Sequence, residues 1–151
     1  MNSTARTWSV RSLLDVNMLV ALGDVEHPHH ILVQTWMQAN ASAGWATCPI
    51  TQNGFLRIAA LPSNPRAQKM LQSSQLLSAW IADPHHAFWP DDVSILNTQL
   101  FDHSRLLGHG QITDAYLLAL AVKHGGRFVT LDRRVTLASV RGAQPEHLVV
   151  V

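Results

Sequence analysis

The stretch GQITDAYLLALAVKHGGRFVTLDRR, residues 110–134, decides the fold class. Its first half is an apolar run typical of a buried helix, and two glycines separate that run from RFVTL, residues 127–131, which is typical of a buried strand. Carboxylates nevertheless stand at two points, with Asp114 at the start of the helix and Asp132 directly after the strand. A buried helix that leads into a buried strand indicates a βαβ unit and therefore an α/β fold.

The rest of the chain repeats this alternation of short apolar strands and helices. Strands are expected at residues 12–14, within 44–50, within 85–92 and at the end of 134–151. Helices are expected after residue 15 and in residues 26–42, 51–61 and 65–83, with short helices within 94–108 and 134–151. This order predicts one α/β domain, residues 11–151, built on a parallel sheet flanked by helices.

Two helix starts are assigned from residues that favour helix termini. Pro28 suits the first position of the helix in residues 26–42, and Thr51 suits the N-cap of the helix in residues 51–61. The helix that starts near Pro28 is expected to bury an apolar face made of Ile31, Leu32, Thr35, Trp36 and Ala39. His29 and His30 are adjacent and cannot share one helical face, so surface histidines are favoured over a zinc site.

Composition limits the class of protein. The chain has 151 residues, a charged fraction of 14% and a formal net charge of +1, so any nucleic-acid binding requires a local basic patch. The single cysteine, Cys48, excludes an intramolecular disulfide and fits a reducing compartment. No apolar run is long enough for a membrane helix, and the start lacks the apolar core of a signal peptide. We therefore expect a cytoplasmic protein with a flexible leader, residues 1–10.

Three carboxylates are expected to meet at one edge of the sheet. Asp15 ends the first strand and Asp132 ends the strand in residues 127–131, while Asp114 opens a helix that can face the same edge. Ligands of open parallel sheets bind at the carboxyl ends of the strands, where the strand order reverses. Clustered carboxylates repel one another unless a cation neutralises them, and hard oxygen ligands suit Mg²⁺ or Mn²⁺. Such a site supports metal-assisted hydrolysis of a phosphodiester.

Each acid also has a structural interpretation. Asp114 follows Thr113, a good N-cap, and an acid in a first helical turn interacts favourably with the helix dipole. Asp132 can be a turn residue after a strand. Asp15 is harder to explain in this way, because apolar residues flank it on both sides and an unpaired buried acid is costly. The functional interpretation therefore rests on the expected convergence of the three acids.

Four motifs together resemble a known family. They are LLDVNMLVAL at residues 13–22, TCPITQNGFLRI at 47–58, GHGQITDAYLLALAVKHGG at 108–126 and FVTLDRR at 128–134. In this order they resemble the motifs of PIN-domain ribonucleases, and in particular the VapC toxins of bacterial type II toxin–antitoxin pairs. The resemblance covers residues 13–151, nearly the whole chain.

The resemblance implies a parallel five-stranded sheet with an acidic pocket at the strand ends. It implies a toxin that uses Mg²⁺ or Mn²⁺ to cut RNA of the tRNA or rRNA class, forms a homodimer and is blocked by a VapB-like antitoxin. Asp15, Asp114 and Asp132 match the family's catalytic and metal-binding acids. Asn17 and Thr130 match the polar residues that support them, two places after the first acid and two places before the late one.

Two departures from the family pattern leave an alternative open. The family usually has a glutamate in the helix after the second strand, where this chain has Gln52 or possibly Asn53, whose amides bring no charge. Many relatives have a further acid where this chain has Arg133 and Arg134, which could contact RNA phosphates together with Arg57. The alternatives to an active ribonuclease are a binding module with weak or no activity and, ranked last, a nuclease acting on single-stranded DNA.

Overall fold

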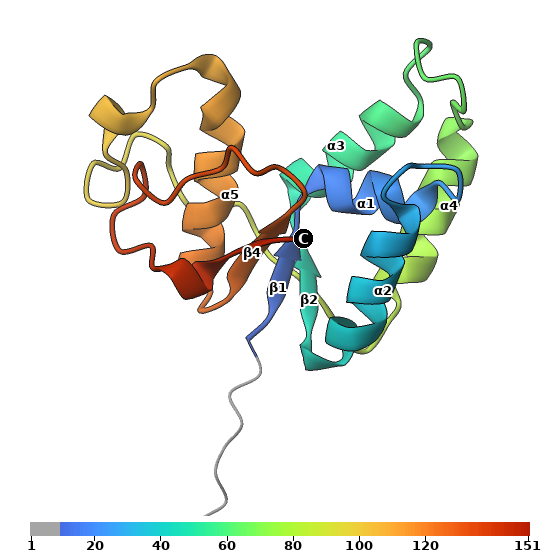
Figure 1. Cartoon of the computed structure of the whole chain (residues 1–151), viewed down its shortest axis with the longest axis horizontal. Coiled ribbons are helices and arrows are strands. Elements are labelled where there is room, and N and C mark those ends of the chain that lie inside the picture. Colours follow the sequence, from blue (N-terminus) through green and yellow to red (C-terminus); the bar gives the residue numbers. More distant parts are fainter. Residues whose placement is uncertain (1–9) are drawn as a thin grey trace, which may run out of the picture.

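The computed structural model describes residues 10–151, so the expected leader lies outside the described residues apart from Val10. Five parallel strands form one sheet in the order β3-β2-β1-β4-β5 (Figure 1). The strands are β1 (Ser12–Leu14), β2 (Trp45–Thr47), β3 (His86–Phe88), β4 (Arg127–Thr130) and β5 (Leu148–Val150). The predicted five-stranded parallel sheet of an α/β domain is confirmed.

Helices cover both faces of the sheet. On one side lie α1 (Val16–Gly23), α2 (His30–Asn40), α3 (Pro49–Ala59) and α4 (Met70–Ile81), and on the other side lies α5 (Ile112–Lys123) (Figure 1). The strand order reverses at β1, which pairs with β2 on one edge and with β4 on the other. The carboxyl ends of β1 and β4 therefore flank the switch point at which such sheets bind ligands. No helix in the described part of the chain is long and apolar enough to cross a bilayer.

The two faces of the sheet are buried in two separate cores. Leu13 and Phe128 point into the core that they share with the apolar side chains of α5, and both are fully buried. Their neighbours Leu14 and Val129 point the other way into the core formed with α1 to α4, and they are also fully buried. Because successive strand residues face opposite sides, burial on both faces explains why neighbouring residues of the central strands β1 and β4 are both apolar.

The turn between α5 and β4 allows no side chain at Gly126. A Cβ atom there would lie 2.5 Å from the carbonyl oxygen of Arg11 and 2.6 Å from the ring of Trp89. We expect Gly126→Ala to lower the free energy of unfolding by about 1–3 kcal/mol, because a backbone atom and a buried ring must shift. Urea denaturation checks this, with Gly108→Ala as control, because a Cβ atom at Gly108 meets nothing within 4 Å. Equal losses in the two variants would contradict the packing argument.

The start and the buried face of α2 differ from the prediction. The helix begins at His30 rather than at Pro28, and its buried side chains are His30, Val33 and Met37. Ile31 is 70% exposed and Leu32 is 46% exposed, and Thr35 and Ala39 are exposed as well, so the predicted buried face is wrong except at the half-buried Trp36. Residues three and four apart share a helical face, and the face that starts at His30 is the one turned to the core.

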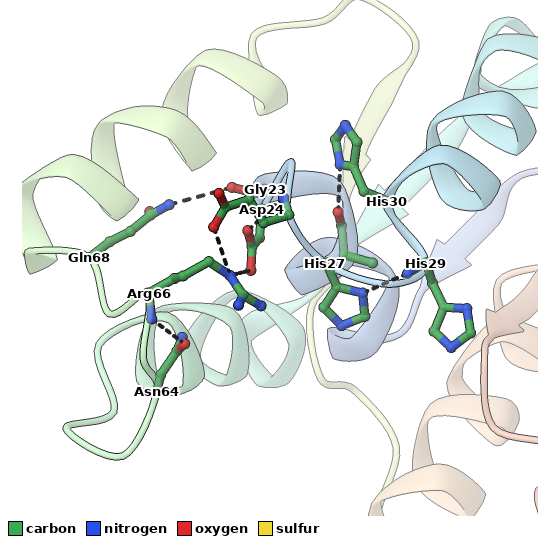
Figure 2. A network of polar contacts seen from close by, with 10 residues as sticks. Gly23, Asp24, His27, His29, His30, Asn64, Arg66 and Gln68 are labelled. Atoms are coloured by element: carbon green, nitrogen blue, oxygen red, sulfur yellow. Dashed lines mark hydrogen bonds and ion pairs between the residues drawn. The ribbon is translucent and has the colours of Figure 1, made fainter.

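A polar network holds the connection between α1 and α2 (Figure 2). The ring of His30 lies 2.8 Å from the carbonyl oxygen of Ala21, and Arg66 Nε donates to Asp24 at 2.7 Å. The amide of Gln68 donates to the carbonyl of Gly23 at 3.4 Å, which ties the segment before α4 to the end of α1. The prediction of a surface histidine is therefore wrong for His30, whose ring satisfies a buried carbonyl.

Several other helix boundaries also differ. The N-cap of α3 is Cys48, and Thr51 lies within the first turn, where its hydroxyl accepts from the Cys48 N–H at 3.0 Å. Helix α4 begins at Met70 rather than near residue 65. Pro65 lies instead in a segment of turns before the helix.

The two short helices expected within residues 94–108 and 134–151 are absent as α-helices. These segments contain 3₁₀ turns at His103–Arg105 and Pro145–His147. Their backbones pair with each other instead, through an antiparallel bridge between Phe101 and Val140. The Arg141 N–H also donates to the Leu100 carbonyl at 2.8 Å. Long-range pairing thus replaces the local helices that the sequence favours.

Candidate active site

Asp15 occupies the junction between β1 and α1. It is the N-cap of α1, and its Oδ1 accepts from the Val16 N–H at 2.7 Å. Its Oδ2 accepts from the Thr130 hydroxyl at 2.7 Å, and the residue is 7% exposed. Burial raises the pKa of Asp15 above its ordinary value, and the charge of Asp132 raises it further, although the two hydrogen bonds oppose this.

Thr130 connects the ends of β1 and β4. Its hydroxyl donates to Asp15 and accepts from the Asn17 amide at 3.1 Å and from the Asp132 N–H at 3.0 Å. The Asn17 oxygen in turn accepts from the Leu131 N–H at 3.1 Å. Asn17 and Thr130, which match the family's supporting positions, therefore share one hydrogen-bond network with Asp15 and Asp132. This network fixes the orientation of Asp15 relative to the end of β4.

The carboxylate of Asp132 forms a two-point ion pair with Arg134. Nε and Nη2 of Arg134 donate to Oδ1 and Oδ2 of Asp132, each at 3.0 Å, and the Arg134 N–H donates to Oδ1 at 2.9 Å. These hydrogen bonds lower the pKa of Asp132. The side chain of Arg134 is 90% exposed, so solvent screens this pair and little energy is needed to open it.

Asp114 lies half-buried in the first turn of α5. Burial, followed by the charges of Asp15 and Asp132, raises its pKa to about 6, while Arg134 opposes the shift. Thr113 is not the N-cap of this helix; Gln111 takes that place without a side-chain capping bond. The N-cap assignment of Thr113 is therefore wrong, whereas Asp114 does lie in the first turn, where an acid interacts favourably with the helix dipole. The raised pKa reflects first the burial of Asp114 and then the nearby charges of Asp15 and Asp132.

A pocket of about 220 Å³ opens beside two of these acids. Asp114 and Asp132 line it together with Arg134, between the start of α5 and the loop after β4. Asp15 is not among the residues that line it. The sequence did not indicate the other lining residues, of which Gln111, Thr136 and Ser139 have polar side chains. Of these, Thr136 and Ser139 lie in a loop with no periodic pattern that would have indicated a site.

The raised pKa of Asp114 predicts a pH-dependent stability. Its pKa is about 6 in the folded chain against an ordinary value of 3.8, so the folded state holds the proton more tightly. Stability contributed by that proton is lost as the pH rises from about 4 through about 6. We expect metal-free Asp114→Asn to melt above the parent at pH 7.5 and to lose this advantage below pH 4. A thermal melt series in EDTA checks this, and a lower melting temperature at pH 7.5 would contradict it.

The donor set of the site suits a hard divalent cation. Carboxylates that raise one another's pKa at one sheet edge are relieved by a cation, and oxygen ligands suit Mg²⁺ and Mn²⁺. Within residues 10–151, no three His, Cys, Asp or Glu side chains are grouped closely enough to hold a metal ion as they stand. The carboxylate of Asp132 is engaged with Arg134, so that ion pair must open before all three acids share a cation.

Gln52, and not Asn53, is directed at the end of β2. Its amide nitrogen donates to the Thr47 hydroxyl at 3.0 Å, and that hydroxyl lies 2.7 Å from Nε2 of His86. Burial lowers the pKa of His86, which favours the neutral ring and lets Nε2 accept from Thr47. Asn53 is exposed. Of the two amides, Gln52 is thus the one that reaches the carboxyl end of β2, and its match to the family's glutamate stays a prediction.

The three arginines expected at an RNA-binding surface do not lie together at the pocket. Arg134 lines it, whereas Arg57 is exposed in the last turn of α3 and Arg133 is exposed in the loop after β4. Neither Arg57 nor Arg133 lines the pocket. Arg134 contacts Asp132 in this structure, so its expected phosphate contact remains a prediction.

Comparison with known proteins places the chain in a family. The family model described as PIN domain matches residues 12–142. The chain belongs to the PIN-domain family. It is 45% identical to Ribonuclease VapC44 of Mycobacterium tuberculosis over 92% of this chain and 98% of that protein. It is 42% identical to Ribonuclease VapC38 of the same species, over 93% of this chain and 99% of that protein.

A solved structure supports the fold of this PIN domain independently. The crystal structure of Mycobacterium tuberculosis VapC20, a toxin that cleaves the sarcin–ricin loop, matches with a TM-score of 0.58. The match covers 89% of this chain and 99% of that chain, at 14% sequence identity. The prediction of a PIN domain similar to the VapC proteins is confirmed by these three comparisons.

Proposed function

We propose that this PIN domain is a metal-dependent endoribonuclease that acts as the toxin of a toxin–antitoxin pair. The observation that carries the proposal is the set of Asp15, Asp114 and Asp132 at the switch point of the sheet, where the first two have raised pKa values. The similarity to VapC44 and VapC38, both named ribonucleases, supports RNA as the substrate. Hydrolysis of a phosphodiester by an activated water needs no covalent intermediate.

The side chains have distinct roles in this proposal. Asp15, Asp114 and Asp132 would hold the cation, which when bound supplies the positive charge that polarises the phosphate. Thr130 donates to Asp15 and so keeps one carboxylate oxygen fixed. When Asp132 leaves Arg134, the freed guanidinium can make the same two-point contact with an RNA phosphate.

Gln52 would take the place of the usual glutamate without adding charge. Because its amide nitrogen is engaged by Thr47, its oxygen is the atom left to orient a ligand or a water. We further propose Mg²⁺ or Mn²⁺ as the cofactor and single-stranded regions of tRNA or rRNA as the target class.

The partners proposed are a VapB-like antitoxin and a second copy of the chain. The names of the relatives support an antitoxin, because VapC proteins are the toxins of VapBC pairs. Exposed apolar side chains at the starts of α2 and α4 add support for a protein partner: Ile31 is 70% exposed, Met70 53% and Leu71 67%.

A substrate comparison tests the proposed activity. Purified protein is incubated with Mg²⁺ or Mn²⁺ and with an RNA oligomer or the DNA oligomer of the same sequence. We expect cleavage of the RNA and none of the DNA. Cleavage of DNA alone would favour the nuclease that acts on single-stranded DNA, and cleavage of neither would favour a binding module.

Gln52 favours the binding module as the second candidate function, because an amide weakens cation binding relative to a carboxylate. We expect Gln52→Glu to raise Mn²⁺ affinity and cleavage by about 10–100-fold, the scale on which groups around a metal act. Isothermal titration with Mn²⁺ and an RNA cleavage assay check this, with Asn53→Glu as the matched control on the exposed side of α3. Cleavage by the variant with none by the parent would establish the binding module, and vigorous cleavage by the parent would exclude it.

A further inference from the structure

We propose that the pocket beside Asp114 and Asp132 receives one nucleobase of the RNA next to the cleaved bond. The inference rests on the proposed ribonuclease function and specifies how that site reads its substrate. Asp114, Asp132 and Arg134 are the charged residues that line the pocket, and the other lining residues are neutral and come from the segment around the start of α5 and from the loop after β4. A phosphodiester held at the two acids therefore brings the next base of the RNA beside the neutral residues of the pocket.

The neutral part of the pocket has the chemistry that a base requires. Ala115 and Val135 contribute apolar surface against which a ring can pack. Thr136 and Ser139 contribute hydroxyls that can donate or accept a hydrogen bond. Within residues 10–151, neither hydroxyl has a hydrogen-bond partner. The Ser139 hydroxyl is not one of the unpaired polar atoms that are fully buried. Both hydroxyls can therefore form a hydrogen bond with a ligand in the pocket.

Gln111 gives the pocket a defined donor. Its side-chain oxygen accepts from the Leu107 N–H at 2.8 Å, which fixes the orientation of the amide. The two N–H groups of this amide find no acceptor elsewhere in the described chain. Gln111 is exposed, so a carbonyl oxygen or ring nitrogen on the edge of a base can replace water as the acceptor of these N–H groups.

The charge of the pocket favours a base over a bare phosphate. When Asp114, Asp132 and Arg134 are all ionised, the wall carries one net negative charge, and the single guanidinium is already paired with Asp132. In the metal-free pocket a phosphate would meet the two acids and an Arg134 that is already paired, whereas a neutral base is not repelled.

A base also fits better than an arginine from a protein partner. An arginine would be attracted to the acids, but it brings N–H donors only and would leave the Gln111 donors unpaired. The mixture of donors and acceptors on a base can satisfy Gln111 and the two hydroxyls together.

The part of the pocket at Ser139 is held by backbone contacts before any ligand binds. Ser139 is followed by Val140, which is 4% exposed and bridges to the fully buried Phe101. The Ser139 carbonyl accepts from the Asp102 N–H at 3.0 Å. Little conformational entropy of the protein is therefore lost on binding. A preorganised pocket of this kind can discriminate one base from another.

Direct binding tests the pocket without metal or cleavage. The full-length ¹⁵N-labelled chain in EDTA is titrated separately with adenosine, guanosine, cytidine, uridine, ribose and arginine ethyl ester. We expect at least one nucleoside to shift the side-chain amide signal of Gln111 and the backbone signals of Thr136 and Ser139, and ribose to shift none. The amide of Gln38, exposed on α2, serves as the internal control. Shifts by the arginine ester alone would assign the pocket to a protein side chain, and no shift above ribose would overturn the proposal.

Cleavage preference separates this inference from the proposed function. Products from an RNA library with randomised bases are sequenced for the parent, Gln111→Ala, Thr136→Val and the control Gln38→Ala. We expect each pocket variant to change the preference for the base at one fixed position by about three- to tenfold, the worth of one hydrogen bond. An unchanged preference in variants that still cleave would overturn the base pocket and leave the ribonuclease standing. Absence of cleavage by the parent would count against the proposed function itself.

Discussion

Asp114→Asn is expected to lower metal-dependent RNA cleavage by about 10²–10³-fold, since a cation at the phosphate is worth several kcal/mol and each 1.4 kcal/mol is tenfold. Asparagine keeps the size of the side chain but removes the negative charge that would hold the cation. Asp114 lines the pocket and has its pKa raised to about 6 by burial and by the neighbouring acids Asp15 and Asp132. A fluorogenic RNA assay at pH 7.5 with Mg²⁺ measures the effect.

The matched control for this variant is Asp92→Asn. Asp92 pairs with Lys123 at 3.3 Å and with His124 at 3.1 Å, at the opposite end of α5 from Asp114. Its removal costs a surface ion pair and leaves the site unchanged, so we expect cleavage within about twofold of the parent. Similar losses in the two variants would show that any lost carboxylate weakens the protein, and a fully active Asp114→Asn would remove Asp114 from the site.

Thr130→Val is expected to weaken both stability and cleavage. The hydroxyl of Thr130 donates to the buried carboxylate of Asp15 and accepts from Asn17 and Asp132. Valine has nearly the same shape, so the packing of β4 is kept while three hydrogen bonds are lost. We expect the free energy of unfolding to fall by about 1–3 kcal/mol, the cost of leaving a buried polar group unpaired. Cleavage should fall by about 10–100-fold, as for other groups that orient a metal ligand.

Thr130→Ser separates the hydroxyl from the packing. Serine keeps the hydroxyl and loses a methyl group from a fully buried side chain. We expect this variant to lose stability but to retain most of its cleavage, measured by urea denaturation and by the RNA assay. A larger loss of cleavage in Thr130→Ser than in Thr130→Val would contradict the role of the hydroxyl.

The sheet could be predicted because each strand is short and mostly apolar and several strands end at a recognisable residue. Asp15 follows Leu14, and Asp132 comes two residues after Thr130, so the rule that parallel strands present their carboxyl ends at one edge places both acids together. The buried face of α2 could not be predicted in this way. Ile31 and Leu32 are apolar but exposed, and a histidine, His30, takes the buried position because it bonds the Ala21 carbonyl.

The full composition of the pocket could not be predicted for a different reason. Ser139 is positioned by the bridge between Phe101 and Val140, which joins segments that are far apart in the sequence. No local pattern encodes such a contact, and the local propensity of the loop favoured a short helix instead. The pairing of Arg134 with Asp132 is local, but the sequence does not decide between a carboxylate and a phosphate as its partner.

The central claim is that the acids at the ends of β1 and β4 and at the start of α5 act through a bound cation. The most direct test is cleavage of a single-stranded RNA by folded, antitoxin-free protein, first in EDTA and then after addition of Mg²⁺ or Mn²⁺. The account predicts no cleavage in EDTA and recovery when either cation is in excess. Cleavage that continues undiminished in EDTA would contradict it.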